Sequence, residues 1–523
     1  MRPSSTLLLT LGTCATAKRV VPVSFARQRD DGLVRRDDSN NGTLSQGLLN
    51  NISPSAYYAN VSVGTPPQMV YLVVDTGSAD VWVLDSHADL CQSSLLQAKY
   101  GECLATYDPE KSDSYKVAVE DGFNITYADL NSAAGDYIKD DFHIAGATVS
   151  ALQMGLASNT TINSGVLGIG FDTSESTLDI YPNIVTLLVR QGLIDAEAYS
   201  LFLDDLDAEQ GTILFGGIDT EKYTGELKVV DILPDGFTGK ITSFSVALTS
   251  LAISPPDADE QSVLTEPISV VLDSGTTLTY LPEDVAADIY DAVGAIDDSV
   301  GTGLVYISCS VVDSDKWKDT TFDFQFDKKD GPLIRVGLAD LVINNVADFV
   351  SQGFQIPNDL PFDDPCSFGI QSLEGYYLLG DTFLRSAYVV YDLTNRQIGL
   401  AQANPGSDSS NILEINKAEG IPLVTGAAST ASATSTATTS STSSTTAASQ
   451  PTTTTILTTA ASSTVASSTG LSSTSATSTT AAPTGPNTNT AAARRAPPWT
   501  CVSGVVTLMA LSFSFAGASL FTL

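Results

Sequence analysis

Two short apolar runs, Val70–Val74 and Ile268–Leu272, lie in the two halves of the chain. Each is rich in β-branched or aromatic residues, a composition that favours buried strands. An acidic turn follows each run at once, Asp75–Ser78 in the first half and Asp273–Thr276 in the second. We therefore predict two buried strands, each of which presents a carboxylate at its end, so that the two carboxylates meet across a cleft.

A pair of such carboxylates suits the hydrolysis of peptide bonds by water. The reaction needs a base that takes a proton from water and an acid that protonates the carbonyl oxygen. Two carboxyls that share one proton supply both, because like charges held close together cannot both ionise cheaply. Asp75 and Asp273 are therefore the candidate catalytic residues.

The remaining turn residues are expected to support the aspartates: Thr76, Gly77, Ser78, Ser274, Gly275 and Thr276. Gly77 and Gly275 remove side chains where two loops must approach closely. The hydroxyls three residues after each aspartate, on Ser78 and Thr276, are placed to hydrogen-bond it. Those of Thr76 and Ser274 are expected to bond to the opposite loop. One Asp-Ser/Thr-Gly turn alone is more often structural, but two copies with matching strands favour catalysis.

Further segments in the same order carry a family resemblance, namely Tyr58–Gln68, Asp80–Val83, Leu167–Gly170, Leu378–Asp381, Tyr388–Asp392 and Ile398–Ala401. Over roughly residues 54–405 the chain resembles the pepsin-like aspartic proteases. The resemblance implies a mainly β, bilobal fold with the active site in a cleft between two related β lobes, about 54–225 and 226–405. It also implies an endopeptidase that needs no metal or cofactor and acts on peptides or proteins.

The resemblance also identifies a β-hairpin flap over the cleft. Tyr127 matches the flap tyrosine, and Trp82 matches its usual hydrogen-bond partner. Ala128 departs from the pattern, because glycine is usual there. Asp129 matches a position where an acid in some fungal relatives favours Lys or Arg before the cut, since a carboxylate can pair with a cation.

Charge and histidine content disfavour other classes of protein. The 523-residue chain has a formal net charge of −35, which argues against nucleic acid as a partner. Its two histidines, His87 and His143, stand neither in a metal-ligand spacing nor beside a Gly-x-Ser-x-Gly turn, so zinc and serine hydrolases are poorly supported. We expect a monomer. The alternative function is an inactive, protease-like surface glycoprotein that binds peptides or wall components.

Four cysteines of the mature region allow three pairings. Because two belong to each lobe, we predict the disulfides Cys91–Cys103 and Cys309–Cys366, which the resemblance also implies. Five sequons are consistent with the secretory route: Asn41, Asn51, Asn60, Asn124 and Asn159.

The two ends of the chain carry processing signals. Residues 1–17 are expected to be a signal peptide, and 18–36 a basic pro-segment that a kexin-type protease releases after Arg35-Arg36. The catalytic domain is then 37–405. We also hypothesise that the basic segment shields an acidic cleft until it is removed.

A Ser/Thr-rich segment, 406–490, predicts a disordered, O-glycosylated stalk. Residues 491–523 match a glycosylphosphatidylinositol (GPI) attachment signal that is removed, with Asn489 as the attachment site. The chain therefore most resembles fungal GPI-anchored yapsin-like proteases, with candidapepsins as soluble relatives. It is expected to travel through the secretory pathway to the outer leaflet of the plasma membrane and the cell wall.

Overall fold

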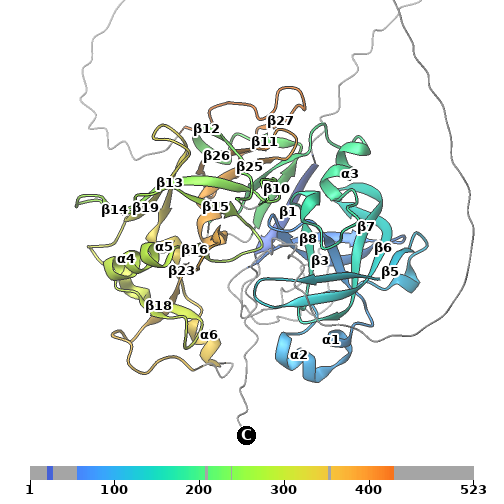
Figure 1. The fold of residues 1–523 in the computed structure, drawn as a ribbon, viewed down its shortest axis with the longest axis horizontal. Coiled ribbons are helices and arrows are strands. Elements are labelled where there is room, and N and C mark those ends of the chain that lie inside the picture. The colour runs from blue at the N-terminus through green and yellow to red at the C-terminus, as the bar shows by residue number, and fades with distance from the viewer. Residues whose placement is uncertain (1–20, 28–55, 206–209, 237, 352–354, 429–523) are drawn as a thin grey trace, which may run out of the picture. The chain divides into compact units, whose positions relative to one another are not determined.

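The computed structural model describes residues 21–27, 56–205, 210–236, 238–351 and 355–428. Strands dominate these ranges, and the helices are short (Figure 1). The predicted signal peptide, Arg35-Arg36, the sequons Asn41 and Asn51, the Ser/Thr-rich segment from residue 429 and the GPI signal with Asn489 lie outside the described residues.

A thirteen-stranded sheet forms the N-terminal half and reaches into the C-terminal half, in the order β12-β26-β25-β9-β10-β1-β2-β3-β8-β4-β7-β6-β5. Its strands are β1 (Val21–Arg27), β2 (Tyr57–Val63), β3 (Gln68–Asp75), β4 (Val81–Leu84), β5 (Lys116–Thr126), β6 (Ser132–Ile144), β7 (Ala147–Thr160), β8 (Gly165–Gly168), β9 (Ala198–Phe202), β10 (Gln210–Phe215), β12 (Tyr223–Asp231), β25 (Ala387–Asp392) and β26 (Gln397–Ala403). The lobe boundary expected near residue 225 falls inside β12, and β25 and β26, from the far end of the C-terminal half, join this sheet beside β9.

The C-terminal half contributes smaller sheets. An eight-stranded sheet comprises β13 (Ser245–Ser254), β14 (Gln261–Leu264), β15 (Ile268–Leu272), β16 (Thr279–Leu281), β19 (Thr321–Phe326), β20 (Leu333–Gly337), β23 (Ile370–Ser372) and β24 (Tyr377–Leu379). A four-stranded sheet comprises β17 (Ile296–Asp298), β18 (Leu304–Ser308), β21 (Val342–Ile343) and β22 (Pro365–Phe368), and β11 (Gly217–Asp219) pairs with β27 (Ile412–Glu414).

Short helices connect the strands. They are α1 (Asp89–Gln92), α2 (Ser94–Tyr100), α3 (Ile184–Arg190), α4 (Glu283–Val293), α5 (Leu338–Leu341), α6 (Val346–Ser351) and α7 (Asp381–Leu384), with 3-10 turns η1 (Pro109–Lys111), η2 (Asp172–Ser174) and η3 (Cys309–Asp313). None of the helices in the described ranges is both long and apolar enough to cross a bilayer.

The two halves repeat one local arrangement around their acidic turns. In the first half β3 runs parallel to β8, with Asp75 opposite Gly168. In the second half β15 runs parallel to β24, with Leu272 opposite Leu379. Each acidic turn therefore follows an internal strand of a sheet: β3 lies between β2 and β8, and β15 lies between β13 and β24. The prediction of a mainly β fold with two related halves is confirmed.

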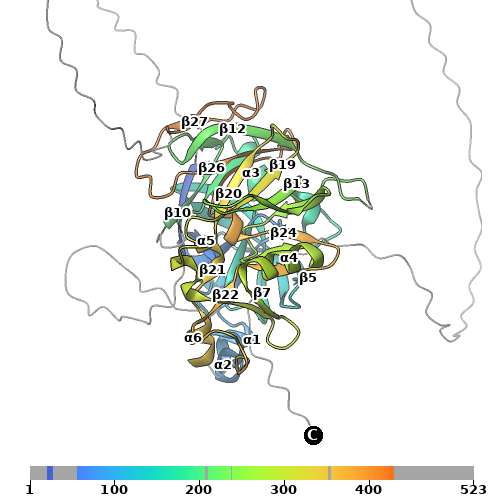
Figure 2. The same cartoon turned by 90° about the vertical axis from the view of Figure 1, so that its left-hand side faces the viewer.

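The packed structure continues past residue 405, where we expected the catalytic domain to end. β27 pairs with β11, and the side chains of Ile415 and Ile421 are buried in a cluster with Tyr223. Isolated bridges join Thr224 to Ala427 and Glu226 to Thr425, and Figure 2 shows β27 beside β12. The expected boundary at residue 405 is therefore too early, because apolar residues of the segment that follows it pack against the folded domain.

Part of the expected pro-segment is a strand of the large sheet. β1 lies between β10 and β2, with six register positions against β10 and three against β2. Residues 21–27 therefore lie in the sheet as an internal strand.

Candidate active site

Asp75 and Asp273 lie together in the interior, at 2 % and 1 % exposure. Their carboxyl groups hydrogen-bond each other. A side chain at either turn glycine would disrupt the pair: a Cβ on Gly275 would lie 2.4 Å from Oδ1 of Asp75, and one on Gly77 would lie 2.7 Å from Oδ1 of Asp273. Glycine is therefore required at both positions, because each turn approaches the aspartate of the opposite turn closely, as the sequence predicted.

Each carboxylate is held by its own turn. Oδ1 of Asp75 accepts the backbone N–H of Gly77 at 2.8 Å, and the hydroxyl of Ser78 donates to Oδ2. Oδ1 of Asp273 accepts the N–H of Gly275 at 2.9 Å, and the hydroxyl of Thr276 donates to its Oδ2 at 2.7 Å. Both expected hydroxyl bonds are present.

The middle hydroxyls cross to the opposite turn. Oγ1 of Thr76 donates to the carbonyl of Leu272 at 3.0 Å and accepts the N–H of Ser274 at 2.9 Å. Oγ of Ser274 donates to the carbonyl of Val74 at 2.8 Å and accepts the N–H of Thr76 at 3.2 Å. Four hydrogen bonds between buried groups thus join the turns that carry the aspartates.

The environment of the pair favours retention of one proton. Burial raises the pKa of Asp75, against hydrogen bonds that lower it. Burial, and then the charge of Asp75, raise the pKa of Asp273 well above its usual range. The two titration steps belong to the pair, because each charge alters the other. One carboxylate can then take a proton from water while the other acid protonates the carbonyl oxygen of the substrate.

The hairpin that the resemblance identifies as the flap consists of β5, β6 and a turn at residues 127–131. The indole N–H of Trp82 donates to the hydroxyl of Tyr127 at 2.8 Å, and both side chains are buried. The N–H of Leu130 donates to the carbonyl of Tyr127 at 3.0 Å, and Leu130 takes the left-handed conformation with φ 68°. Ala128 does not need a positive φ, so a Cβ is compatible with this turn.

Asp129 lies at the tip of the flap and is part of a local turn. Its Oδ1 accepts the N–H of Asn131 at 2.9 Å, and its Oδ2 accepts the side-chain amide of Asn131 at 2.6 Å. These bonds orient the carboxylate at the edge of the flap.

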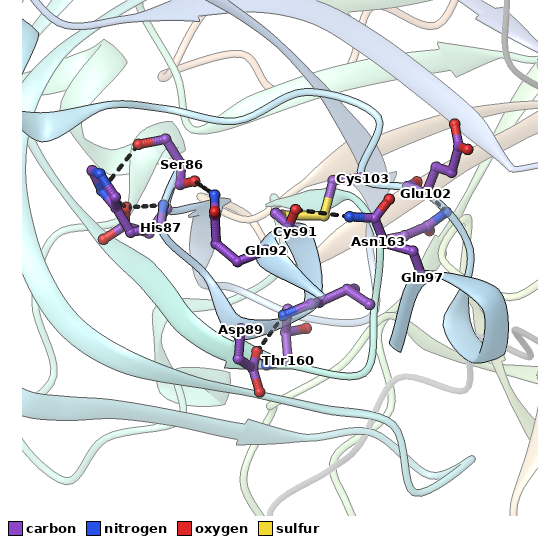
Figure 3. The surroundings of a disulfide bond; sticks show 12 residues. Ser86, His87, Asp89, Cys91, Gln92, Gln97, Glu102, Cys103, Thr160 and Asn163 are labelled. Carbon is purple, nitrogen blue, oxygen red and sulfur yellow. Dashed lines mark hydrogen bonds and ion pairs between the residues drawn. A yellow bond between two sulfur atoms is a disulfide. The ribbon is translucent and has the colours of Figure 1, made fainter. Parts of the chain in front are cut away.

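Both predicted disulfides are present, Cys91–Cys103 and Cys309–Cys366. Around the first, shown in Figure 3, the amide of Asn163 donates to the carbonyl of Glu102 at 3.0 Å, and the amide of Gln97 donates to the carbonyl of Cys91 at 2.7 Å. The bridge therefore links α1 to the segment after α2, and Asn163 joins that segment to the connection between β7 and β8.

The three sequons within the described ranges lie on exposed strand positions, at Asn60, Asn124 and Asn159. The amide of Asn159 donates to Oδ2 of Asp89 at 3.0 Å. Within those ranges, no group of His, Cys, Asp and Glu side chains is arranged to hold a metal ion.

Sequence reasoning missed a buried cluster next to the first turn. The carboxylate of Asp80 accepts hydrogen bonds from the hydroxyls of Tyr137 and Tyr181 and from the N–H of Ser176. The spacing along the chain gives no signal for it, because these donors lie 57 to 101 residues away.

Comparisons with known proteins agree with this geometry. A family model, "Eukaryotic aspartyl protease", matches residues 56–403. The chain is 39% identical over 388 residues to "Probable aspartic-type endopeptidase opsB" of Aspergillus oryzae, which covers 72% of this chain and 74% of that protein. It is 38% identical to "Acid protease" of Saccharomycopsis fibuligera, covering 67% and 81% of the two chains.

A third relative is "Secreted aspartic protease 8" of Candida albicans, 34% identical over 71% of this chain and 80% of the relative. The family match spans both acidic turns, the flap and the last strands of the large sheet. The chain belongs to the eukaryotic aspartyl protease family and is an aspartic-type peptide hydrolase.

Proposed function

We propose that this chain is a secreted endopeptidase, held at the cell surface, that uses Asp75 and Asp273 to hydrolyse peptide bonds in acidic surroundings. The observation that carries the catalytic part is the buried, hydrogen-bonded pair of carboxyls, joined by the crossing bonds of Thr76 and Ser274. Such a pair must keep one proton to supply an acid and a base together, which favours acidic conditions.

The catalytic proposal is tested by incubating the mature ectodomain with a mixed peptide library at acidic pH, with and without pepstatin. Mass spectrometry should detect internal cuts that pepstatin suppresses and that Asp75→Asn abolishes. Bound but uncut peptides would instead favour the peptide-binding glycoprotein.

We further propose that Asp129 favours Lys or Arg at the residue before the cut. The support is its position at the tip of the flap, where Asn131 holds the carboxylate in one orientation. Asp129→Ala should reduce kcat/KM for substrates with Lys or Arg before the cut more than for those with Leu or Phe. An equal loss for both kinds of substrate would reject this role.

Secretion and GPI anchoring form the third part of the proposal. Support comes from the apolar C-terminal segment, the Ser/Thr-rich segment before it, and the printed name of the secreted relative from Candida albicans. Phosphatidylinositol-specific phospholipase C should release the protein from cells. A mature mass that includes residues 491–523 would contradict anchoring.

Processing by a kexin-type protease after Arg35-Arg36 completes the proposal. It is supported by the paired basic residues alone. N-terminal sequencing of the mature protein should begin at Asp37, and a variant without the basic pair should retain the segment.

A further inference from the structure

The buried cluster around Asp80 lies close to the catalytic turn but takes no part in the chemistry. Asp80 is fully buried and follows Asp75 by five residues. Its Oδ1 accepts the hydroxyls of Tyr181 at 2.7 Å and Tyr137 at 2.9 Å, and its Oδ2 accepts the N–H of Ser176 at 2.6 Å. Three donors therefore fix this carboxylate, and two of them come from the loop after η2.

The side chain of Glu175 forms a hydrogen bond within this loop. Glu175 directly follows η2 (Asp172–Ser174) and is 6 % exposed. Its Oε2 accepts the backbone N–H of Tyr181 at 2.8 Å, so one side chain joins the two ends of the segment 175–181. Among the described residues its other oxygen, Oε1, has no hydrogen-bond partner although it is buried. This environment solvates an ionised carboxylate poorly.

The groups that face Glu175 add to this effect. They are Asp80 from the segment after β3, Asp172 from η2, Tyr137 from β6, and Tyr181 from its own loop. Burial, followed by the charges of Asp80 and Asp172, raises the pKa of Glu175 to about 9, although the bond from the N–H of Tyr181 opposes the rise. An ionised Glu175 therefore places a second negative charge beside Asp80, away from water.

An aromatic chain leads from this loop to the flap. The rings of Tyr181 and Tyr137 lie 5.5 Å apart, those of Tyr137 and Phe123 5.5 Å, and those of Phe123 and Trp82 6.1 Å. Trp82 in turn donates to the hydroxyl of Tyr127 at 2.8 Å. Because interiors are close-packed, a displaced Tyr181 cannot leave the other rings in place.

We propose that Glu175 is a positioning residue for the endopeptidase reaction and acts in its neutral form. The protonated side chain keeps the loop 175–181 closed on Asp80, and through the aromatic chain it holds the flap tyrosine, Tyr127, in place. Loss of the proton to solvent opens the loop, weakens the binding of substrate and limits the working range of the enzyme at higher pH. Glu175 itself does not touch the substrate.

The direction in which pH changes the stability follows from the protonation of Glu175 in the folded and the unfolded chain. Below the usual pKa of Glu, about 4.3, the folded and unfolded chains both hold the proton. Between there and about 9 the folded chain keeps the proton while the unfolded chain releases it. Each unit of pH in that interval raises the unfolding equilibrium constant by up to about tenfold, relative to a chain with a neutral residue at this position.

Glu175→Gln is the test, because the amide has the same shape, can accept the N–H of Tyr181 and cannot ionise. At pH 4 its kcat/KM should match that of the wild type within about twofold. From pH 5 to pH 7 the unfolding constant of the wild type should rise relative to the variant by about 10- to 100-fold, measured in urea. Over the same interval KM should change similarly in both proteins, because the folded wild type keeps the proton on Glu175; only as the pH approaches about 9 should KM rise in the wild type more than in the variant.

Asp179→Asn is the matched control, since it removes one negative charge from an exposed position of the same loop. It should follow the wild type at every pH. Glu175→Ala, which loses the bond to Tyr181, should raise KM already at pH 4.

The proposal is overturned if the unfolding curves of the wild type and Glu175→Gln depend on pH in the same way, or if Asp179→Asn reproduces the effect. A folded Glu175→Gln variant that is inactive at pH 4, or an Ala variant with a wild-type KM, would also contradict it. The inference rests on the endopeptidase activity of the same site, but unfolding in urea does not depend on that activity. The two assignments can therefore fail separately.

Discussion

Replacing Thr76 with Val tests whether the two acidic turns hold the two lobes together at the proposed catalytic pair, Asp75 and Asp273. Valine keeps the shape of threonine, so the change leaves no cavity. It removes the hydroxyl that donates to the carbonyl of Leu272 and accepts the N–H of Ser274. The site is 1 % exposed, so water cannot readily replace these partners.

The expected magnitude follows from the two buried groups that lose a partner. Each costs about 1–3 kcal/mol when left unsatisfied, so the free energy of unfolding should fall by about 2–6 kcal/mol. A shift of the turn also separates the carboxyls, and misplacement of reacting groups by about 1 Å lowers kcat on the order of 10²-fold. Urea unfolding at pH 4 and initial rates on one peptide substrate measure the two effects.

Thr224→Val is the control, because Thr224 lies on β12, is only half-buried and is far along the chain from either turn. It should change the free energy of unfolding by no more than about 0.5 kcal/mol. A Thr76→Val protein that unfolds within this margin of the wild type and keeps its kcat would refute the reasoning. Ser274→Ala removes the reciprocal bonds, and its effect should not add to that of Thr76→Val, since the two residues share partners.

Three further predictions concern the flap, the first disulfide and the pH profile. Trp82→Phe removes the donor to Tyr127, and kcat/KM should fall by roughly tenfold, or about 1.4 kcal/mol; an unchanged value would show that the bond does not position the flap. Replacing Cys91 and Cys103 together by Ala opens a loop with a sequence separation of 12, and urea unfolding should show a loss of about 3 kcal/mol, whereas no change would indicate a constrained unfolded chain. Because the pKa of Asp273 is raised in the folded enzyme, kcat/KM should fall as rising pH removes the last proton of the pair, and a rate that stays level up to neutral pH would contradict a shared proton.

The geometry of the candidate active site could be predicted from the sequence because its hydrogen bonds are local. A hydroxyl three residues after an aspartate reaches that aspartate through the geometry of the turn itself, and Ser78 and Thr276 do so in the structure. The crossing bonds of Thr76 and Ser274 follow once two such turns face each other. The fold class could be predicted for a different reason, since it was implied by the resemblance to pepsin-like aspartic proteases over roughly residues 54–405, which the family match to residues 56–403 agrees with.

Other features depend on contacts that a linear pattern does not reveal. The side chain of Asp80 resembles an ordinary turn acid in the sequence, and only the fold brings Tyr181, 101 residues away, to its carboxylate. The Ser/Thr-rich composition that indicates a linker begins only near Gly426, whereas residues 406–425 contain apolar residues, of which Ile415 is fully buried. Tertiary contacts decide both cases.

The position of β1 has a consequence for activation. Scission after Arg36 would break one covalent bond beyond the end of this strand and none of the hydrogen bonds that hold it between β10 and β2. The severed peptide would remain bound as a ligand, and its departure would be governed by mass action. Dilution would favour the freed enzyme, while added peptide would rebind between the same two strands and fill the gap that it left.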